Sequence, residues 1–231
     1  MSRLQAQPAA AGRPPKQVHE GVWLFAPSRD SQGGSAWWLE QQNASGVLID
    51  CPAFNEANLA FLQAQRSGRI VLTGREGHGR LRRFQEVLGW PVHVQEQEAY
   101  LLPGAQNLIS FGAEVELDPG LRLLWTPGPT PGAAVLLAEG LPNLESILFC
   151  GRLLSPVALG QVAPLRTRRS FHWGRWLSSI ERLRHWFPPE QPHWLASGAG
   201  LGALRGEVLV PAARRVIDAL NLEELARQAA V

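Results

Sequence analysis

The feature that most constrains the fold is an alternation of strand-like and helix-like segments in the first half of the chain. In order, the segments are a strand at 46–52, a helix at 55–65, a strand at 69–73, a helix at 79–89 and a strand at 91–95. Strands that alternate with helices predict βαβ units, and therefore parallel strand pairs. Two earlier strands, at 21–26 and 35–41, are followed by linkers rich in turn residues, which favour antiparallel pairing. The first half is thus predicted to form one mixed sheet.

The second half of the chain repeats this style. Strands are predicted at 121–126, 133–139, 146–151 and 193–200, an amphipathic helix at 172–187, and a C-terminal helix at 211–229 that starts at a proline. Two such halves predict an α/β fold, an αββα sandwich of two mixed β-sheets flanked by helices. The 231 residues suit one domain. We place that domain at 19–231, after a flexible N-terminal arm at 1–18.

Composition narrows the function and the location. The net charge of +2 is too small to indicate a nucleic-acid-binding protein by itself. No apolar run is long enough to span a membrane, and residues 1–18 lack the apolar core of a secretory signal. We therefore expect a cytoplasmic protein with no membrane partner. The sequence contains two arginine clusters. We interpret the cluster at 80–83 as a solvated helix face. The cluster at 166–169 lies beside aromatic residues, which favours binding of an acidic protein or, more weakly, of nucleic acid.

Five loops, each at the end of a predicted strand, carry a resemblance to a known family. They are "LIDCP" at 48–52, "LTGREGHG" at 72–79, "WTPGPTPG" at 125–132, "LFCGR" at 148–152 and "ASGAG" at 196–200. Their order resembles the metallo-β-lactamase fold superfamily in its glyoxalase II-like branch, and most of all a divergent cyanobacterial and plastid-type subgroup. The resemblance implies the αββα sandwich and a metal-dependent hydrolase site at these loops.

The metal-binding motifs of that family are degenerate in this sequence. The family's ligand positions fall on residues of other types: Gly74, Glu76, His78, Gly79, Pro129, Arg152 and Ala199. Only the aspartate of the first loop is kept, at Asp50, and in the family it orients neighbours. Catalytic zinc needs about three protein ligands, and a permanent cation at Arg152 opposes a dication. We therefore expect zinc to be absent and no other cofactor to replace it.

The resulting hypothesis is a non-hydrolytic pseudoenzyme that acts as a binding or assembly module. Its partner would be a small anionic ligand or an acidic protein. The expected relic pocket consists of Asp50, Thr73, Arg75, Pro129, Arg152 and Ala199. Within it, Arg152 is expected to pair with Asp50 or Glu76, because an uncompensated buried carboxylate is costly.

Two alternatives stay open. In the first alternative, the chain is a hydrolase of this superfamily with a rewired mononuclear or metal-free site. The candidate catalytic residues are then Glu76, His78 and His172. Separately, the resemblance places Cys51 and Cys150 at the same edge of the sandwich. They are then either two buried free thiols or a redox-sensitive pair.

Overall fold

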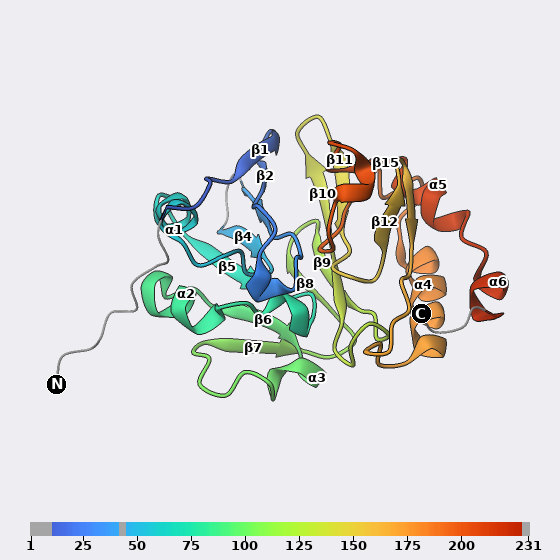
Figure 1. Ribbon diagram of the computed structural model, residues 1–231, viewed down its shortest axis with the longest axis horizontal. Coiled ribbons are helices and arrows are strands. Elements are labelled where there is room, and N and C mark those ends of the chain that lie inside the picture. The colour runs from blue at the N-terminus through green and yellow to red at the C-terminus, as the bar shows by residue number, and fades with distance from the viewer. Residues whose placement is uncertain (1–10, 42–44, 228–231) are drawn as a thin grey trace.

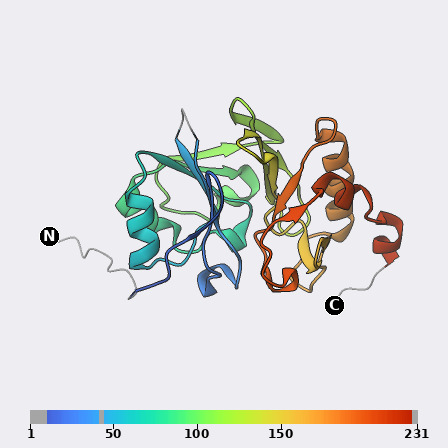
Figure 2. The same cartoon turned by 90° about the horizontal axis from the view of Figure 1, so that it is seen from above.

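The computed structural model describes residues 11–41 and 45–227. Within these residues two β-sheets face each other, with helices on both outer sides (Figures 1 and 2). The first sheet has the order β1 (Lys16–His19), β2 (Val22–Leu24), β3 (Trp37–Leu39), β4 (Gly46–Ile49), β5 (Gly68–Val71), β6 (Val92–Gln95) and β7 (Leu108–Phe111). The second has the order β15 (Val210–Pro211), β14 (Trp194–Ala196), β11 (Glu145–Phe149), β10 (Ala134–Leu141), β9 (Leu121–Trp125) and β8 (Glu114–Asp118). The predicted αββα sandwich is confirmed.

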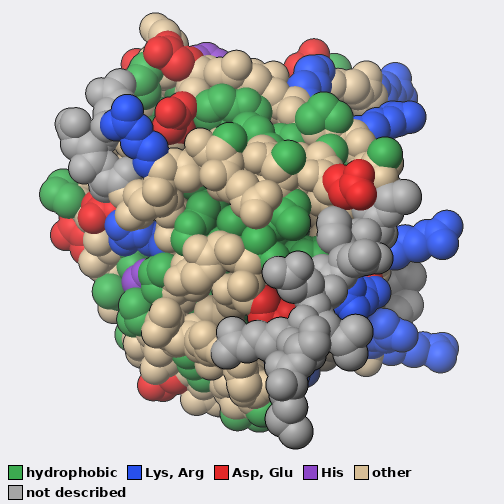
Figure 3. All heavy atoms as spheres, turned by 90° about the vertical axis from the view of Figure 1, so that its left-hand side faces the viewer, with side chains coloured by type: hydrophobic (Ala, Val, Ile, Leu, Met, Phe, Trp, Pro, Cys, Tyr) green, Lys and Arg blue, Asp and Glu red, His purple; other side chains and the backbone are tan. Residues whose placement is uncertain are grey.

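The βαβ prediction for the first half is also confirmed. Strands β1 to β4 pair antiparallel, and β4 to β7 pair parallel. The parallel strands are joined by α1 (Glu56–Gln63), α2 (Leu81–Leu88) and the short α3 (Glu96–Ala99). Helix α1 begins where predicted, because the Asn55 side chain accepts a hydrogen bond from the Asn58 N–H (2.9 Å). Figure 3 views the side formed by α1 and α2, where Lys and Arg side chains gather along the right-hand edge.

The second sheet is covered by α4 (Trp173–Trp186) and α5 (Ala213–Asp218), with α6 (Leu222–Arg227) beyond them (Figure 1). A separate hairpin pairs β12 (Ser155–Ala158) with β13 (Gln161–Ala163). Three short 3₁₀ turns complete the elements: η1 (Arg29–Ser31), η2 (Arg75–Gly77) and η3 (Gly202–Leu204). None of the helices in the described ranges has the length and apolarity that crossing a bilayer requires.

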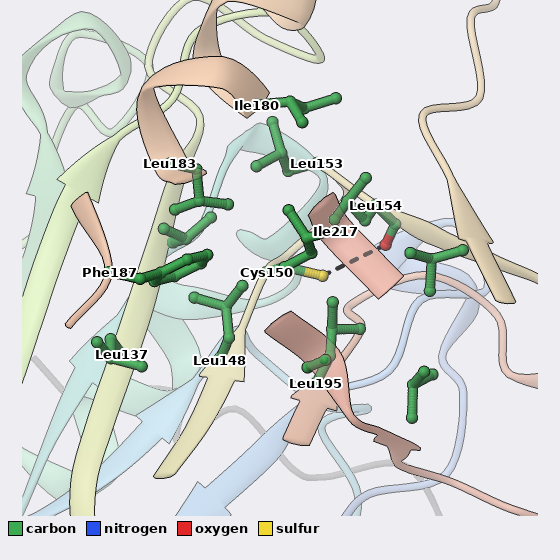
Figure 4. Packing of buried hydrophobic residues seen from close by; sticks show 14 of the residues in the cluster. Leu137, Leu148, Cys150, Leu153, Leu154, Ile180, Leu183, Phe187, Leu195 and Ile217 are labelled. Atoms are coloured by element: carbon green, nitrogen blue, oxygen red, sulfur yellow. Dashed lines mark hydrogen bonds between the residues drawn. The ribbon is translucent and has the colours of Figure 1, made fainter. Parts of the chain in front are cut away.

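Buried apolar side chains form three layers, one between the sheets and one beneath each set of helices. Strand β3 shows why, because its side chains alternate between faces. Trp37 and Leu39 point into the layer between the sheets, whereas Trp38 points toward the helices and stacks on Trp90 at 5.5 Å. Fully burying a large apolar side chain contributes about 1.5–3 kcal/mol. Figure 4 shows part of the layer beneath α4 and α5.

Two boundary predictions are wrong. Lys16–His19 form strand β1, so the last residues of the expected arm at 1–18 belong to the sheet; residues 1–10 lie outside the described part. The single C-terminal helix is instead β15 followed by α5 and α6. Pro211 lies in the edge strand opposite Trp194, and a new helix begins where the Asn221 side chain accepts from the Glu224 N–H (3.1 Å).

Candidate functional site

Backbone hydrogen bonds bring the five loops of the sequence motif together. The loop after β4 joins the glycine loop through Cys51 N–H and the Gly77 carbonyl (2.8 Å). The two sheets are joined where Ala134 N–H donates to the Thr73 carbonyl (2.9 Å). In the second sheet, Gly198 N–H donates to the Gly151 carbonyl (2.7 Å). The loops that the sequence motif placed at strand ends therefore do meet at one edge of the sandwich.

Asp50 lies at the centre of this edge and is bound within the chain. Its carboxylate accepts from the Thr73 N–H (2.8 Å) and from the Thr73 Oγ1 hydroxyl (2.6 Å). Burial raises the pKa of Asp50 to about 6, although the Thr73 hydrogen bonds and the positive charge of Arg152 act in the opposite direction. The orienting role that the resemblance implied for Asp50 thus takes the form of a fixed Asp50–Thr73 pair.

Glycines surround this pair because no side chain fits there. A Cβ at Gly77 would overlap the Asp50 carboxylate. At Gly151 a Cβ would lie 2.5 Å from Thr73 Oγ1, and the backbone φ of +52° also favours glycine. The glycines of these loops therefore serve close packing around Asp50 and Thr73.

Arg152 does not form the ion pair that was expected of it. Its Nη2 donates to the carbonyl oxygens of Ser31 (2.8 Å) and Gln32 (3.2 Å), and so holds the η1 turn against the site. In the described ranges Arg152 belongs to none of the ion pairs, so the predicted pairing with Asp50 or Glu76 is wrong. Its charge nevertheless lowers the pKa of both carboxyl groups.

Arg75 turns away from the expected pocket toward Glu98, a residue that the sequence reasoning missed. The Glu98 side chain is fully buried on α3 and lies 3.4 Å from Arg75 Nε. It also accepts from the Gly132 N–H (3.1 Å), and so ties α3 to the "TPGPTPG" loop. Glu98 stands in a run of Gln and Glu, where neither spacing nor residue type distinguishes one buried acid from its exposed neighbours.

The three candidate catalytic residues are not brought together. Glu76 is half-buried at the centre of the edge, and burial raises its pKa. His78 lines a different cavity beside α2, its Nε2 is buried without a hydrogen-bond partner, and burial lowers its pKa. His172 is exposed, and its Nδ1 accepts from the Arg175 N–H (3.1 Å) as the cap of α4. An acid–base pair of Glu76 and His78 is therefore not assembled.

The central cavity is almost filled. Its volume is about 10 Å³, which is room for about one water molecule. Of the predicted pocket residues, Asp50, Thr73, Pro129 and Arg152 line this cavity. Ala199 lines only the wider groove next to this cavity, and Arg75 lines neither of the two.

The residues present do not fit a catalytic zinc centre. The ionisable oxygens at the cavity come from Asp50 and Glu76, and Asp50 is already bound to Thr73. Among the described residues, no group of three or more His, Cys, Asp or Glu side chains lies close enough to hold a metal ion. Catalytic zinc requires about three such ligands and an open coordination position. The cavity provides too few ligand side chains and too little volume for this.

A wider groove of about 570 Å³ lies next to the cavity and shares Glu76, Pro129 and Arg152 with it. Its other charged side chains within the described part of the chain are Arg168 and Arg169, so that three arginines and one glutamate line the groove. Arginine is well suited to carboxylate and phosphate groups, because its planar fork donates two parallel hydrogen bonds. The groove is therefore the part of this edge that is open to a ligand.

The two cysteines are buried free thiols. Cys51 belongs to the apolar layer beneath α1 and α2, and Cys150 to the layer beneath α4 and α5 (Figure 4). Burial raises the pKa of Cys51, and raises that of Cys150 to about 12. The hypothesis of a redox-sensitive pair is wrong in this structure, because the two thiols lie in different layers.

Similar structures identify the fold. An archaeal metallo-β-lactamase superfamily protein from Sulfolobus tokodaii matches with a TM-score of 0.61 and 17% identity, over 91% of this chain and 88% of its own. The B3 metallo-β-lactamase BLEG-1 matches with a TM-score of 0.58 and 17% identity, over 84% and 95% of the two chains. TTHA1623, in a di-iron-bound form, matches with a TM-score of 0.56 and 18% identity, over 79% and 92%.

The chain therefore has the metallo-β-lactamase fold. Identities of this size show the fold alone. No protein-family model and no curated protein matches the sequence.

Proposed function

We propose that this chain is a non-hydrolytic binding or assembly module built on the metallo-β-lactamase fold. The observation that carries the proposal is the filled cavity, with its volume of about 10 Å³ at the position where the family motif implies metals. Without a metal, the site has no means of lowering the pKa of a water molecule to make a nucleophile at neutral pH. The same fold then provides a rigid frame for surface loops.

The expected ligand is a small anion or an acidic protein, bound at the groove beside the cavity. Support comes from its three arginines, Arg152, Arg168 and Arg169, against the single carboxyl group of Glu76. A nucleic acid is less well supported, because the net charge of +2 is small. We keep the cytoplasm as the expected location.

One observation favours the rival function, a hydrolase with a rewired mononuclear or metal-free site. Glu76 lines both the cavity and the groove, and its raised pKa suits a general acid or base. The proposal of a non-hydrolytic module is better supported, because His78 lines another cavity and offers Glu76 no partner.

Metal content and turnover test the proposal directly. Zinc, iron and manganese are measured per chain after purification without chelator, and far less than one ion per chain is expected. Hydrolysis of ester, thioester and lactone substrates is assayed on the wild type, on Glu76→Gln and on His78→Asn, the variants of two candidate catalytic residues of the rival function. The proposal fails if metal binds stoichiometrically and is lost in either variant, or if turnover disappears in Glu76→Gln.

A further inference from the structure

One long stretch of the second half carries positive charge without any acid. Between Glu145 and Glu181 the sequence contains no Asp or Glu but five arginines: Arg152, Arg166, Arg168, Arg169 and Arg175. The stretch runs through the hairpin β12–β13, the loop at 164–172 and the start of α4. We name the exposed residues of this stretch the acid-free surface; Glu76, which lines the adjoining groove, lies outside the stretch. Its charges are concentrated far beyond what the net charge of the chain suggests.

Exposed apolar side chains are concentrated on the same stretch. Among the described residues, four of the seven large apolar side chains that are exposed belong to it: Val157 (44%), Leu159 (60%), Leu165 (48%) and Phe171 (44%). Leu165, with Arg168 and Arg169, lines the groove of about 570 Å³, and Ser155 and Pro156 of the hairpin form part of its wall. Exposed apolar side chains beside a cluster of arginines are typical of a protein interaction site.

Two aromatic side chains of this surface, Phe171 and Trp173, already make contacts within the chain. The Phe171 ring lies 6.2 Å from the His172 ring and 5.8 Å from the Arg175 guanidinium. The Trp173 ring carries the Arg166 guanidinium at 5.6 Å, and its Nε1 donates to the Leu225 carbonyl. Single-stranded nucleic acid binds by stacking bases on free aromatic faces. The other three exposed apolar side chains, Val157, Leu159 and Leu165, have no π face.

We infer that the acid-free surface docks a segment of another protein in which acidic and apolar side chains are interspersed. The carboxylates of the partner would pair with Arg168 and Arg169, and its apolar side chains would cover Leu165 and the exposed tip of the hairpin. Charge complementarity of this kind orients a partner and speeds its association, while apolar contacts hold it. This inference rests on the proposed binding function and specifies the class of protein that the module binds.

The test uses fluorescence anisotropy with labelled probes on the full chain. The probes are a peptide of alternating glutamate and leucine, a peptide of alternating glutamate and serine, and an oligothymidylate. The wild type is expected to bind the glutamate–leucine peptide more tightly than the other two. The double variant Arg168→Glu, Arg169→Glu should weaken that binding roughly tenfold or more, as loss of paired interface charges does. Leu165→Ser should remove the preference for leucine over serine.

A matched control separates local charge from net charge. Arg66→Glu with Arg82→Glu makes the same change in net charge at two exposed arginines outside the acid-free surface, and should alter binding by no more than about twofold. Thermal unfolding of each variant verifies that it folds.

Four results would overturn the docking inference: equal weakening by both double variants, tighter binding of the oligothymidylate, no binding of either peptide, or self-association of the wild type that Arg168→Glu, Arg169→Glu abolishes. None of these results changes the metal content or the turnover on which the proposed function depends, so the two failures are distinguishable.

Discussion

The filled cavity and the groove beside it share loops, but they differ in whether their polar side chains are bound within the chain or exposed to solvent. In the cavity Asp50 is bound by Thr73, and the surrounding loops are tied to one another by backbone hydrogen bonds. In the groove Arg168 and Arg169 face solvent, and Glu76 is the only acid among the described residues that line it. Polar groups that are satisfied within the chain stabilise it, whereas exposed, unbalanced charges remain available to a partner. The comparison therefore separates a structural centre from a binding surface.

The largest effect is expected at the glycine packed against Thr73. Gly151→Ala places a Cβ 2.5 Å from Thr73 Oγ1 on a backbone with φ +52°. Overpacking and the left-handed backbone together should lower the free energy of unfolding by about 3 kcal/mol. Urea denaturation measures this loss.

Gly160→Ala is the matched control for that change. Gly160 has a φ of +68°, but nothing lies within 4 Å of the added Cβ. It should therefore lose only about 1 kcal/mol, the cost of the backbone conformation. Equal losses in the two variants would show that the packing around Thr73 is loose, and that the cavity is not a structural centre.

The second effect is a pH dependence that arises from Asp50. Burial raises its pKa from 3.8 to about 6, so the folded protein keeps this proton where the unfolded chain has released it. The resulting stability is complete below pH 3.8 and is lost as the pH rises through about 6. The loss of stability amounts to about 3 kcal/mol, and the variant Asp50→Asn does not show it.

In denaturation experiments, the stability of Asp50→Asn should therefore increase relative to that of the wild type as the pH rises from about 4 to about 7. A stability difference that does not vary with pH would contradict the burial of this carboxyl group.

The smallest effect is expected at Arg152, one of the three residues that line both the cavity and the groove. Arg152→Ala removes the hydrogen bonds to the Ser31 and Gln32 carbonyls, and should cost about 1–2 kcal/mol, because the side chain is partly exposed. It should also raise the pKa of Asp50 further, since the Arg152 charge lowers it. Arg168→Ala, on the groove side, should cost about 0.5 kcal/mol or less. Equal costs for the two arginines would remove the distinction between cavity and groove.

Much of the fold could be predicted because it depends on local patterns. The βαβ order, the Asn55 cap and the amphipathic stripe of α4 follow from periodicity and capping chemistry over a few residues. The break in the C-terminal helix could not be predicted in this way. Pro211 is compatible with a helix start, and only its pairing with Trp194 in the second sheet makes it the end of a strand.

For the site, the sequence by itself determined which side chains are available. At three of the positions where the resemblance implies metal ligands, Gly74, Pro129 and Ala199 carry no donor side chain. Only the tertiary structure decided where the remaining charges go. Arg152 binds two carbonyls instead of a carboxylate, and Arg75 binds Glu98. Such pairings are set by loops that are distant in sequence and meet only when both sheets have formed, so no local pattern encodes them.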